Sequence, residues 1–139
     1  MFSSQRSIIL STLLFSFLFL RADPSFAVEI DGPVTTTQSF SSDNETLTIN
    51  SGGNLIVSTG GHGINVSNKS NWTIDINANA GDGVFTTVSG NAIRVGPVGE
   101  TGQLNLNSGT ISSANAAAVY LFTSAKNIYL NTAESTYIT

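Results

Sequence analysis

Acidic side chains are the first residues in this sequence to consider for chemistry, because polysaccharide-active enzymes work with paired carboxylates. The candidates are Asp43, Glu45, Asp75, Asp82 and Glu100. Only Asp75 stands in a segment of alternating apolar and polar residues, where it would face outward from a strand. The equivalent positions in the repeats described below are Thr48, Asn105 and Tyr129 rather than a second acid. The pattern therefore predicts no carboxylate pair and no catalytic residue.

The single histidine is the next candidate for chemistry. His62 lies within residues 60–63, a Gly-Gly-His-Gly string that is similar to the start of the calcium-binding nonapeptide repeat. That repeat needs an Asp where Asn65 stands, and nothing recurs after nine residues. The chain has no Cys and no second His to complete a metal centre. We expect His62 to be a solvated turn residue, and we expect no metal or cofactor.

Composition narrows the possible partners. The 139 residues include five Lys and Arg, nine Asp and Glu, and only 10% charged side chains, whereas soluble domains average about 25%. Nucleic-acid binding needs clustered basic side chains, so we expect no nucleic acid partner. The length allows one domain at most, and the absence of Cys excludes a disulfide framework.

The first 27 residues have the layout of a secretory signal peptide. Arg6 supplies a positive charge, and an apolar run follows at residues 8–20. Ser25 and Ala27 fit the small-x-small cleavage pattern, with Ala22 as the alternative site. The run is shorter than the roughly 20 apolar residues of a spanning helix. We therefore expect a signal peptide at 1–27 that is removed, rather than a membrane anchor.

Short apolar segments recur along the remaining chain. The pattern aliphatic-x-aliphatic-Asn-small begins at residues 47, 74, 104 and 128, at spacings of 27, 30 and 24. Two further series keep step with it, one at residues 63–66, 92–95 and 118–121, the other at 55–57, 84–86 and 110–112. Each segment alternates with period two, as a half-buried strand does.

Three short strands per repeat predict the fold class. Such strands cannot bury their apolar faces within one repeat, but stacking the next repeat covers all three. The sequence therefore predicts an all-β, right-handed parallel β-helix of about 3.5 coils with three short strands each. We expect this solenoid at residues 46–139, after the signal peptide and a lead-in at residues 28–45.

Alternation also predicts which side chains point into the solenoid. We expect Leu47, Ile74, Leu104 and Ile128 to form one inward column. The intervening polar residues should face water, among them Thr48, Asp75, Asn65 and Arg94.

The asparagine of the recurring pattern suggests a structural role at the corners. Asn tolerates the left-handed backbone conformation better than most residues, and stacked amides can bond along a solenoid as a ladder. We therefore predict structural corner and ladder positions at Asn50, Asn77, Asn107 and Asn131.

Two other features have alternative interpretations. Trp72 either packs at the start of a strand or forms a carbohydrate platform. Sequons begin at Asn44, Asn65, Asn68 and Asn71; they either carry glycans or arise from a composition rich in Asn, Ser and Thr.

The sequence resembles the N-terminal passenger segment of Gram-negative autotransporters of the AIDA and pertactin type. Residues 60–66 (GGHGINV) and 104–111 (LNLNSGTI) carry the likeness best. The resemblance implies a β-helix at or released from the outer surface, serving adhesion or virulence. Its partner would be a host surface, the extracellular matrix or another cell.

The sequence departs from that family in one respect: it contains no C-terminal β-barrel. We therefore expect a fragment or truncated product, attached to a membrane only through the leader or a missing barrel, and periplasmic if none is supplied. Uncapped coils also predict end-to-end self-association. The alternative functions are a β-helical polysaccharide-active enzyme and a non-functional remnant of a longer gene.

Overall fold

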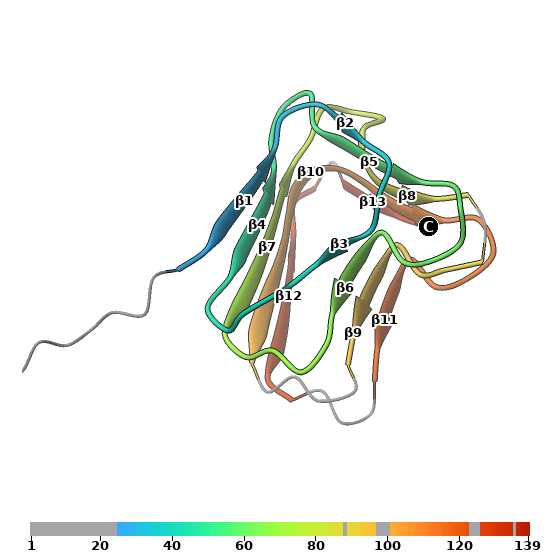
Figure 1. Ribbon diagram of the computed structural model, residues 1–139. Helices are drawn as coiled ribbons and strands as arrows, with labels where there is room; N and C mark the ends of the chain where they lie inside the picture. Colours follow the sequence, from blue (N-terminus) through green and yellow to red (C-terminus); the bar gives the residue numbers. More distant parts are fainter. Residues whose placement is uncertain (1–24, 88, 97–100, 123–125, 135) are drawn as a thin grey trace, which may run out of the picture.

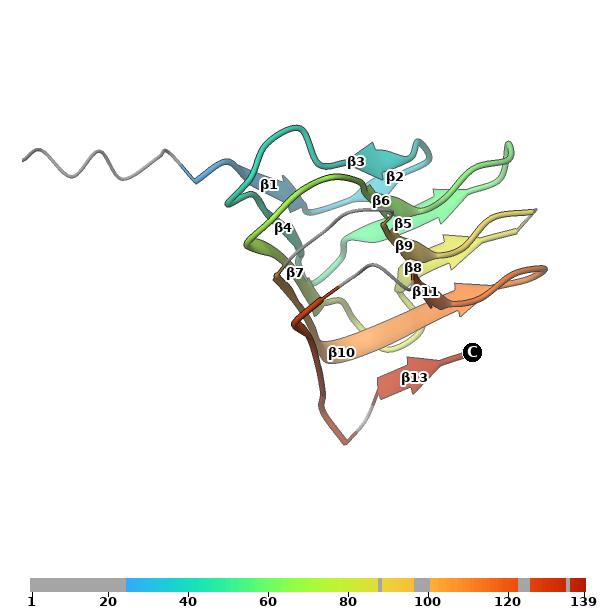
Figure 2. The same ribbon diagram turned by 90° about the horizontal axis from the view of Figure 1, so that it is seen from below.

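Parallel strands stack on one another to form a β-solenoid (Figures 1 and 2). The structure is a computed structural model and describes residues 25–87, 89–96, 101–122, 126–134 and 136–139. These residues contain strands, turns and bends but no helix, so none of their segments is a helix able to cross a membrane. The predicted all-β fold and parallel β-helix are therefore confirmed.

Three walls make up the solenoid, and each wall is a stack of parallel strands (Figure 1). The first wall contains β1 (Ala27–Ile30), β4 (Thr46–Ile49), β7 (Trp72–Asn77), the first half of β10 (Gly102–Ser113), and β12 (Ile128–Thr132). The second contains β2 (Pro33–Val34), β5 (Asn54–Val57), β8 (Gly83–Thr86), the second half of β10, and β13 (Thr136–Ile138). The third contains β3 (Gln38–Ser39), β6 (Ile64–Val66), β9 (Ile93–Val95) and β11 (Val119–Leu121).

The predicted inward column is present, with one correction. Leu47 pairs with Ile74, and Ile74 with Leu104. The fourth member is Leu130, because Gly102 pairs with Ile128. The recurring Asn-small pattern had placed β12 two residues away from this register. A shift of two residues keeps every side chain on its face, so the alternation was read correctly although the register was not.

The solenoid begins earlier than the sequence pattern indicated. Residues 28–45 are not a separate lead-in, because β1, β2 and β3 pair in parallel with β4, β5 and β6. Val28 and Ile30 lie beside Leu47 and Ile49 and continue the inward column. The signal was weak because β2 and β3 are each only two residues long. The expected signal peptide lies, apart from residues 25–27, outside the described residues.

The inward side chains form one continuous apolar core. Its largest fully buried members include Trp72, Ile49, Leu55, Ile64, Ile74, Ile76, Ile93, Leu106 and Ile111. At the C-terminal end of the stack, Leu121, Leu130 and Ile138 continue the inward columns but are 46%, 52% and 41% exposed. No described strand lies beyond them. Within the described residues, these side chains are therefore not covered by a further coil.

Candidate functional site

The outer face of the first wall carries a column of polar side chains. Strand register aligns Glu29, Thr48, Asp75, Asn105 and Asn131. The Asn105 Nδ2 donates to Asp75 Oδ1 over 2.7 Å, and the Asn131 Nδ2 donates to Asn105 Oδ1 over 2.7 Å. We call these three residues, Asp75, Asn105 and Asn131, the amide ladder. Each amide retains a second N–H that can bind a ligand.

The four predicted ladder residues are placed differently. Asn107 Nδ2 donates to Asn77 Oδ1 over 2.8 Å, which joins two of them. Asn50 instead donates to Asp31 Oδ1 over 2.7 Å, and Asn131 belongs to the amide ladder. The four asparagines therefore do not form one continuous ladder but take part in separate hydrogen bonds.

Other asparagines occupy the left-handed corner positions. Among the described non-glycine residues, positive φ occurs at Asn44, Asn68, Asn71 and Asn127, with φ between 51° and 58°. Asn71 and Asn127 immediately precede the first-wall strands β7 and β12, and Asn44 lies two residues before β4. The left-handed role proposed for Asn50, Asn77, Asn107 and Asn131 is therefore wrong. An Asn shortly before three of the first-wall strands, β4, β7 and β12, was the signal in the sequence that we missed.

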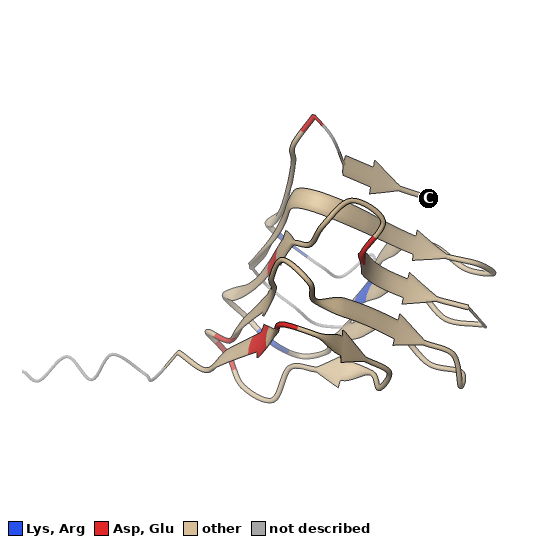
Figure 3. Cartoon of the chain, turned by 90° about the horizontal axis from the view of Figure 1, so that it is seen from above, with Lys and Arg blue, Asp and Glu red and all other residues tan. Residues whose placement is uncertain are grey.

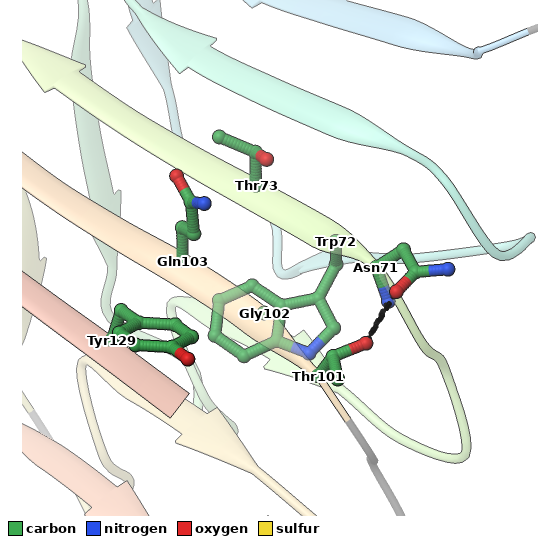
Figure 4. A pocket seen from close by; sticks show the side chains of 7 residues that line it. All are labelled: Asn71, Trp72, Thr73, Thr101, Gly102, Gln103 and Tyr129. Atoms are coloured by element: carbon green, nitrogen blue, oxygen red, sulfur yellow. Dashed lines mark hydrogen bonds between the residues drawn. The ribbon is translucent and has the colours of Figure 1, made fainter. Parts of the chain in front are cut away.

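A pocket of about 180 Å³ opens at the corner that leads into the first wall (Figure 4). It is lined by Asn71, Trp72, Thr73, Thr101, Gly102, Gln103 and Tyr129. Gln103 lies between Thr73 and Tyr129 on adjacent strands, so three strands contribute neighbouring side chains. The Asn71 amide and the Thr101 hydroxyl bond to each other at its rim. Hydroxyl and amide groups beside an exposed tyrosine suit a polar, hydroxyl-rich ligand.

Trp72 forms the inner side of this pocket rather than an exposed platform. Its side chain is only 1% exposed, and its ring packs edge-to-face against Phe40 with centroids 6.4 Å apart. A Cβ added to Gly102 would lie 2.0 Å from the Trp72 ring, so the ring occupies the space that Gly102 leaves. The indole Nε1 is buried without a hydrogen-bond partner in the described part of the chain. Trp72 is thus a core residue at the start of β7.

Three of the candidate acidic side chains accept hydrogen bonds, two from backbone amides and one within the amide ladder. Glu45 is buried, and its Oε2 accepts hydrogen bonds from the Ser41 and Ser42 amides at 2.7 and 3.0 Å. Asp43 accepts one from the Ser70 amide at 2.8 Å. Asp75 has Thr48 and Asn105 as neighbours in its column, as predicted. Asp82 lies in the turn before β8, and Glu100 lies outside the described residues.

His62 was expected to be a solvated turn residue, but both its ring and its backbone carbonyl accept hydrogen bonds. Its Nδ1 accepts a hydrogen bond from the Asn91 amide at 3.1 Å, and its carbonyl accepts one from Thr37 at 2.7 Å. Burial, and then the charge of Arg94, lower the pKa of His62 below its usual 6.5. Within the described residues no group of three His, Cys, Asp or Glu side chains could hold a metal ion.

Arg94 is the charged residue on the outer face of the third wall. Its Nη1 donates to Asn65 Oδ1 over 2.9 Å, and its guanidinium lies 4.7 Å from the Phe122 ring centroid. Figure 3 marks the acidic and basic positions along the described chain.

These faces define the class of protein as a parallel β-solenoid with polar, hydrogen-bonding outer walls. Comparisons with models of protein families, with curated proteins and with solved structures found no match. Inferences about function therefore rest on the fold and on the side chains of the outer walls.

Proposed function

We propose that this chain is an exported β-solenoid segment of an autotransporter-like adhesin or virulence protein, which acts by presenting a binding surface. The supporting observation is the outer face of the first wall, where the amide ladder runs beside the pocket at Gln103 and Tyr129. These groups bind and orient a ligand, and none is arranged as a catalytic pair.

A solenoid wall suits this role because it holds polar groups at fixed intervals. Stacked strands lie about 4.8 Å apart, and their amides are already oriented by the bonds between coils. Little conformational entropy is lost when such groups bind a ligand. Individual hydrogen bonds to an exposed face are weak, so tight adhesion would require many copies on one surface.

The proposed location is the outer surface or the extracellular space, with the periplasm as the location where no barrel is supplied. The proposed partner is a host surface, the extracellular matrix or another cell. A composition with 10% charged residues supports recognition through hydroxyl and amide groups rather than through ionic contacts.

Binding of the purified chain to glycan arrays, matrix proteins and fixed cells tests this function. The informative variant is Gln103→Ala with Tyr129→Ala, which removes exposed pocket side chains without touching the core. Thr110→Ala, on the second wall, is the matched control. We expect the double variant to lose about tenfold in apparent affinity and the control to match the parent chain.

Two results would contradict the proposal. One is the absence of any binding above that of the heat-denatured chain. The other is the release of new reducing or unsaturated ends from polysaccharides, which would identify an enzyme instead.

A further inference from the structure

We infer that the pocket at Gln103 holds a single ring of a neutral sugar, and that the buried indole N–H of Trp72 donates a hydrogen bond to one of its oxygens. This inference rests on the proposed function and deepens it, because it names the ligand class of the pocket in the proposed binding surface. It is carried by a buried donor without a partner, by the side chains around that donor and by the size of the pocket.

The indole N–H of Trp72 is a buried donor that the described residues leave without an acceptor. The ring lines the pocket, and buried indole N–H groups usually have a hydrogen-bond partner. A donor that is already out of water incurs no further desolvation cost when it binds an acceptor. A ligand oxygen that reaches Nε1 therefore gains more than it would from an exposed donor.

The N–H edge of the ring is directed toward the rim of the pocket. Cε2, the ring carbon bonded to Nε1, is the atom that a Cβ at Gly102 would meet first. Figure 4 shows the indole nitrogen on the side of the ring that faces Thr101, the residue before Gly102. The Thr101 hydroxyl is engaged elsewhere, because it accepts from the Asn71 amide at 3.1 Å and donates to the Asn71 side-chain oxygen. Rotation of the Thr101 side chain away from Asn71 gives a ligand oxygen access to Nε1.

The side chains around the pocket favour an uncharged ligand with hydroxyl groups. None of the seven lining residues carries a charge, so an acidic sugar or a phosphate would find no cation among them. Thr73 and Gln103 offer a hydroxyl and an amide, which both donate and accept hydrogen bonds, as sugar hydroxyls do. The exposed Tyr129 ring offers an apolar face on which the C–H groups of a pyranose can pack.

The volume of the pocket limits the ligand to about one ring. Sites for drug-sized ligands measure about 300–1,000 Å³, whereas this pocket measures about 180 Å³. That is the volume of about six water molecules at roughly 30 Å³ each. An extended peptide is a poorer fit, because peptides bind sheets by pairing with an open edge. Here β7 pairs with β4 and β10, and β10 pairs with β7 and β12.

The site lies on the outer face of the first wall. Thr73, Gln103 and Tyr129 alternate with the inward residues of β7, β10 and β12. A further strand paired with β12 would extend the wall beside Tyr129 and leave this face uncovered, because paired strands lie in the plane of the sheet. The site therefore does not depend on what adjoins the described strands.

The indole signal of Trp72 tests the inference directly, because this is the only tryptophan of the chain. A nitrogen–proton correlation NMR spectrum of the labelled chain therefore contains one indole N–H signal. The probes are the methyl β-glycosides of glucose and galactose and the methyl α-glycoside of mannose, at up to about 10 mM, which detects millimolar binding. We expect at least one of them to move the signal downfield, the direction of a new hydrogen bond, whereas glucuronate and glycerol leave it in place.

An analogue of tryptophan without the N–H separates hydrogen bonding from packing. Benzothienylalanine has the shape of tryptophan but carries sulfur in place of the N–H, so at residue 72 it keeps the contacts with Phe40 and Gly102. It should weaken binding of the glycoside about tenfold in ligand-observed NMR. Gln103→Glu should also weaken binding, and Thr110→Ala, on the second wall, should match the parent chain. Far-UV circular dichroism confirms that each chain is folded.

The inference is overturned if no glycoside moves the indole signal while the parent chain binds glycans, matrix proteins or cells; the proposed function then stands without it. It is also overturned if the benzothienyl chain binds as tightly as the parent, or if glucuronate or a matrix peptide moves the signal as far as the neutral glycosides. A parent chain that binds nothing in any of these assays would contradict the proposed function as well.

Discussion

At the scale of single residues, the close contact between Trp72 and Gly102 explains how one bulky side chain fits into a narrow core. Trp72 pairs in register with Gly102, and the ring lies where a side chain at residue 102 would be. Interiors are packed to crystal-like density, so neither residue can be enlarged without a shift of its neighbour.

Replacing Gly102 with alanine should lower the free energy of unfolding by about 1–3 kcal/mol, the usual cost of overpacking. The added Cβ would lie 2.0 Å from the Trp72 ring. Gly32→Ala is the control, since a Cβ there meets nothing within 4 Å. Urea denaturation measures the free energy of unfolding of both variants. Equal stability of the two variants would contradict the packing described for Trp72.

The amide ladder should stabilise the first wall through its middle residue. Asn105 donates to Asp75 and accepts from Asn131, so Asn105→Ala removes two hydrogen bonds. We expect the free energy of unfolding to fall by about 1–2 kcal/mol. Asn107→Ala, which removes the single bond to Asn77, should cost less. The reverse order in urea denaturation would show that the ladder does not form.

His62 should make stability depend on pH. Its pKa is lowered below 6.5 in the folded state, so the unfolded chain binds the extra proton first as the pH falls. The stabilisation is complete above pH 6.5 and is lost progressively as the pH drops towards the folded-state pKa. Thermal melts at pH 7.5 and 5.5 should differ for the parent chain and differ less for His62→Gln. An unchanged difference in that variant would assign the effect to other groups.

At the scale of strands, alternation decides which substitutions the fold tolerates. Leu106 is fully buried, so Leu106→Asp would bury a lone carboxylate and should prevent folding. Gln103→Asp, on the outer face of the same strand, should leave the far-UV spectrum and the melt nearly unchanged. Comparable losses in both variants would refute the assignment of the two faces.

Much of this element-level structure could be predicted from the sequence. The positions of β4 to β11 follow from period-two alternation, because each strand has one buried and one solvated face. The strands β2 and β3 could not be found in this way, since two residues carry no periodicity. The register of β12 was wrong because the repeated Asn was taken as the aligned position, whereas Asn131 pairs with Asn105 rather than with Asn107.

The candidate site was less predictable than the fold. The outward position of Asp75 followed from alternation, and its partnership with Asn105 follows from the spacing of the repeats. The pocket combines residues 71–73, 101–103 and 129, which come together only once the exact register is known. The corner role of Asn71 and Asn127 depends on backbone geometry rather than on residue type alone.

At the scale of the whole molecule, the residues beside the expected cleavage site are paired with the next coil. The Thr46 amide donates to the Phe26 carbonyl at 2.8 Å, and Ala27 pairs with Thr46. Cleavage after Ala27 would remove both partners, whereas cleavage after Ala22 would retain them.

We expect the form secreted by a Gram-negative host to begin at Val28, as the cleavage pattern indicates. The mass of the secreted chain and its N-terminal sequence measure this directly. A chain that starts at Asp23 would show that the complete β1 is kept. An uncleaved chain would contradict the proposed export.

The central claim is that successive coils stack directly on one another, so that Thr46 lies beside Thr73, 27 positions later in the sequence. Paired residues on adjacent strands lie about 4.8 Å apart, close enough for a disulfide. The variant Thr46→Cys with Thr73→Cys should therefore oxidise within one molecule, as shown by peptide mass spectrometry after proteolysis. The offset pair Thr48→Cys with Thr73→Cys should stay reduced, and preferential linkage of that pair, or of neither, would contradict the stacked fold.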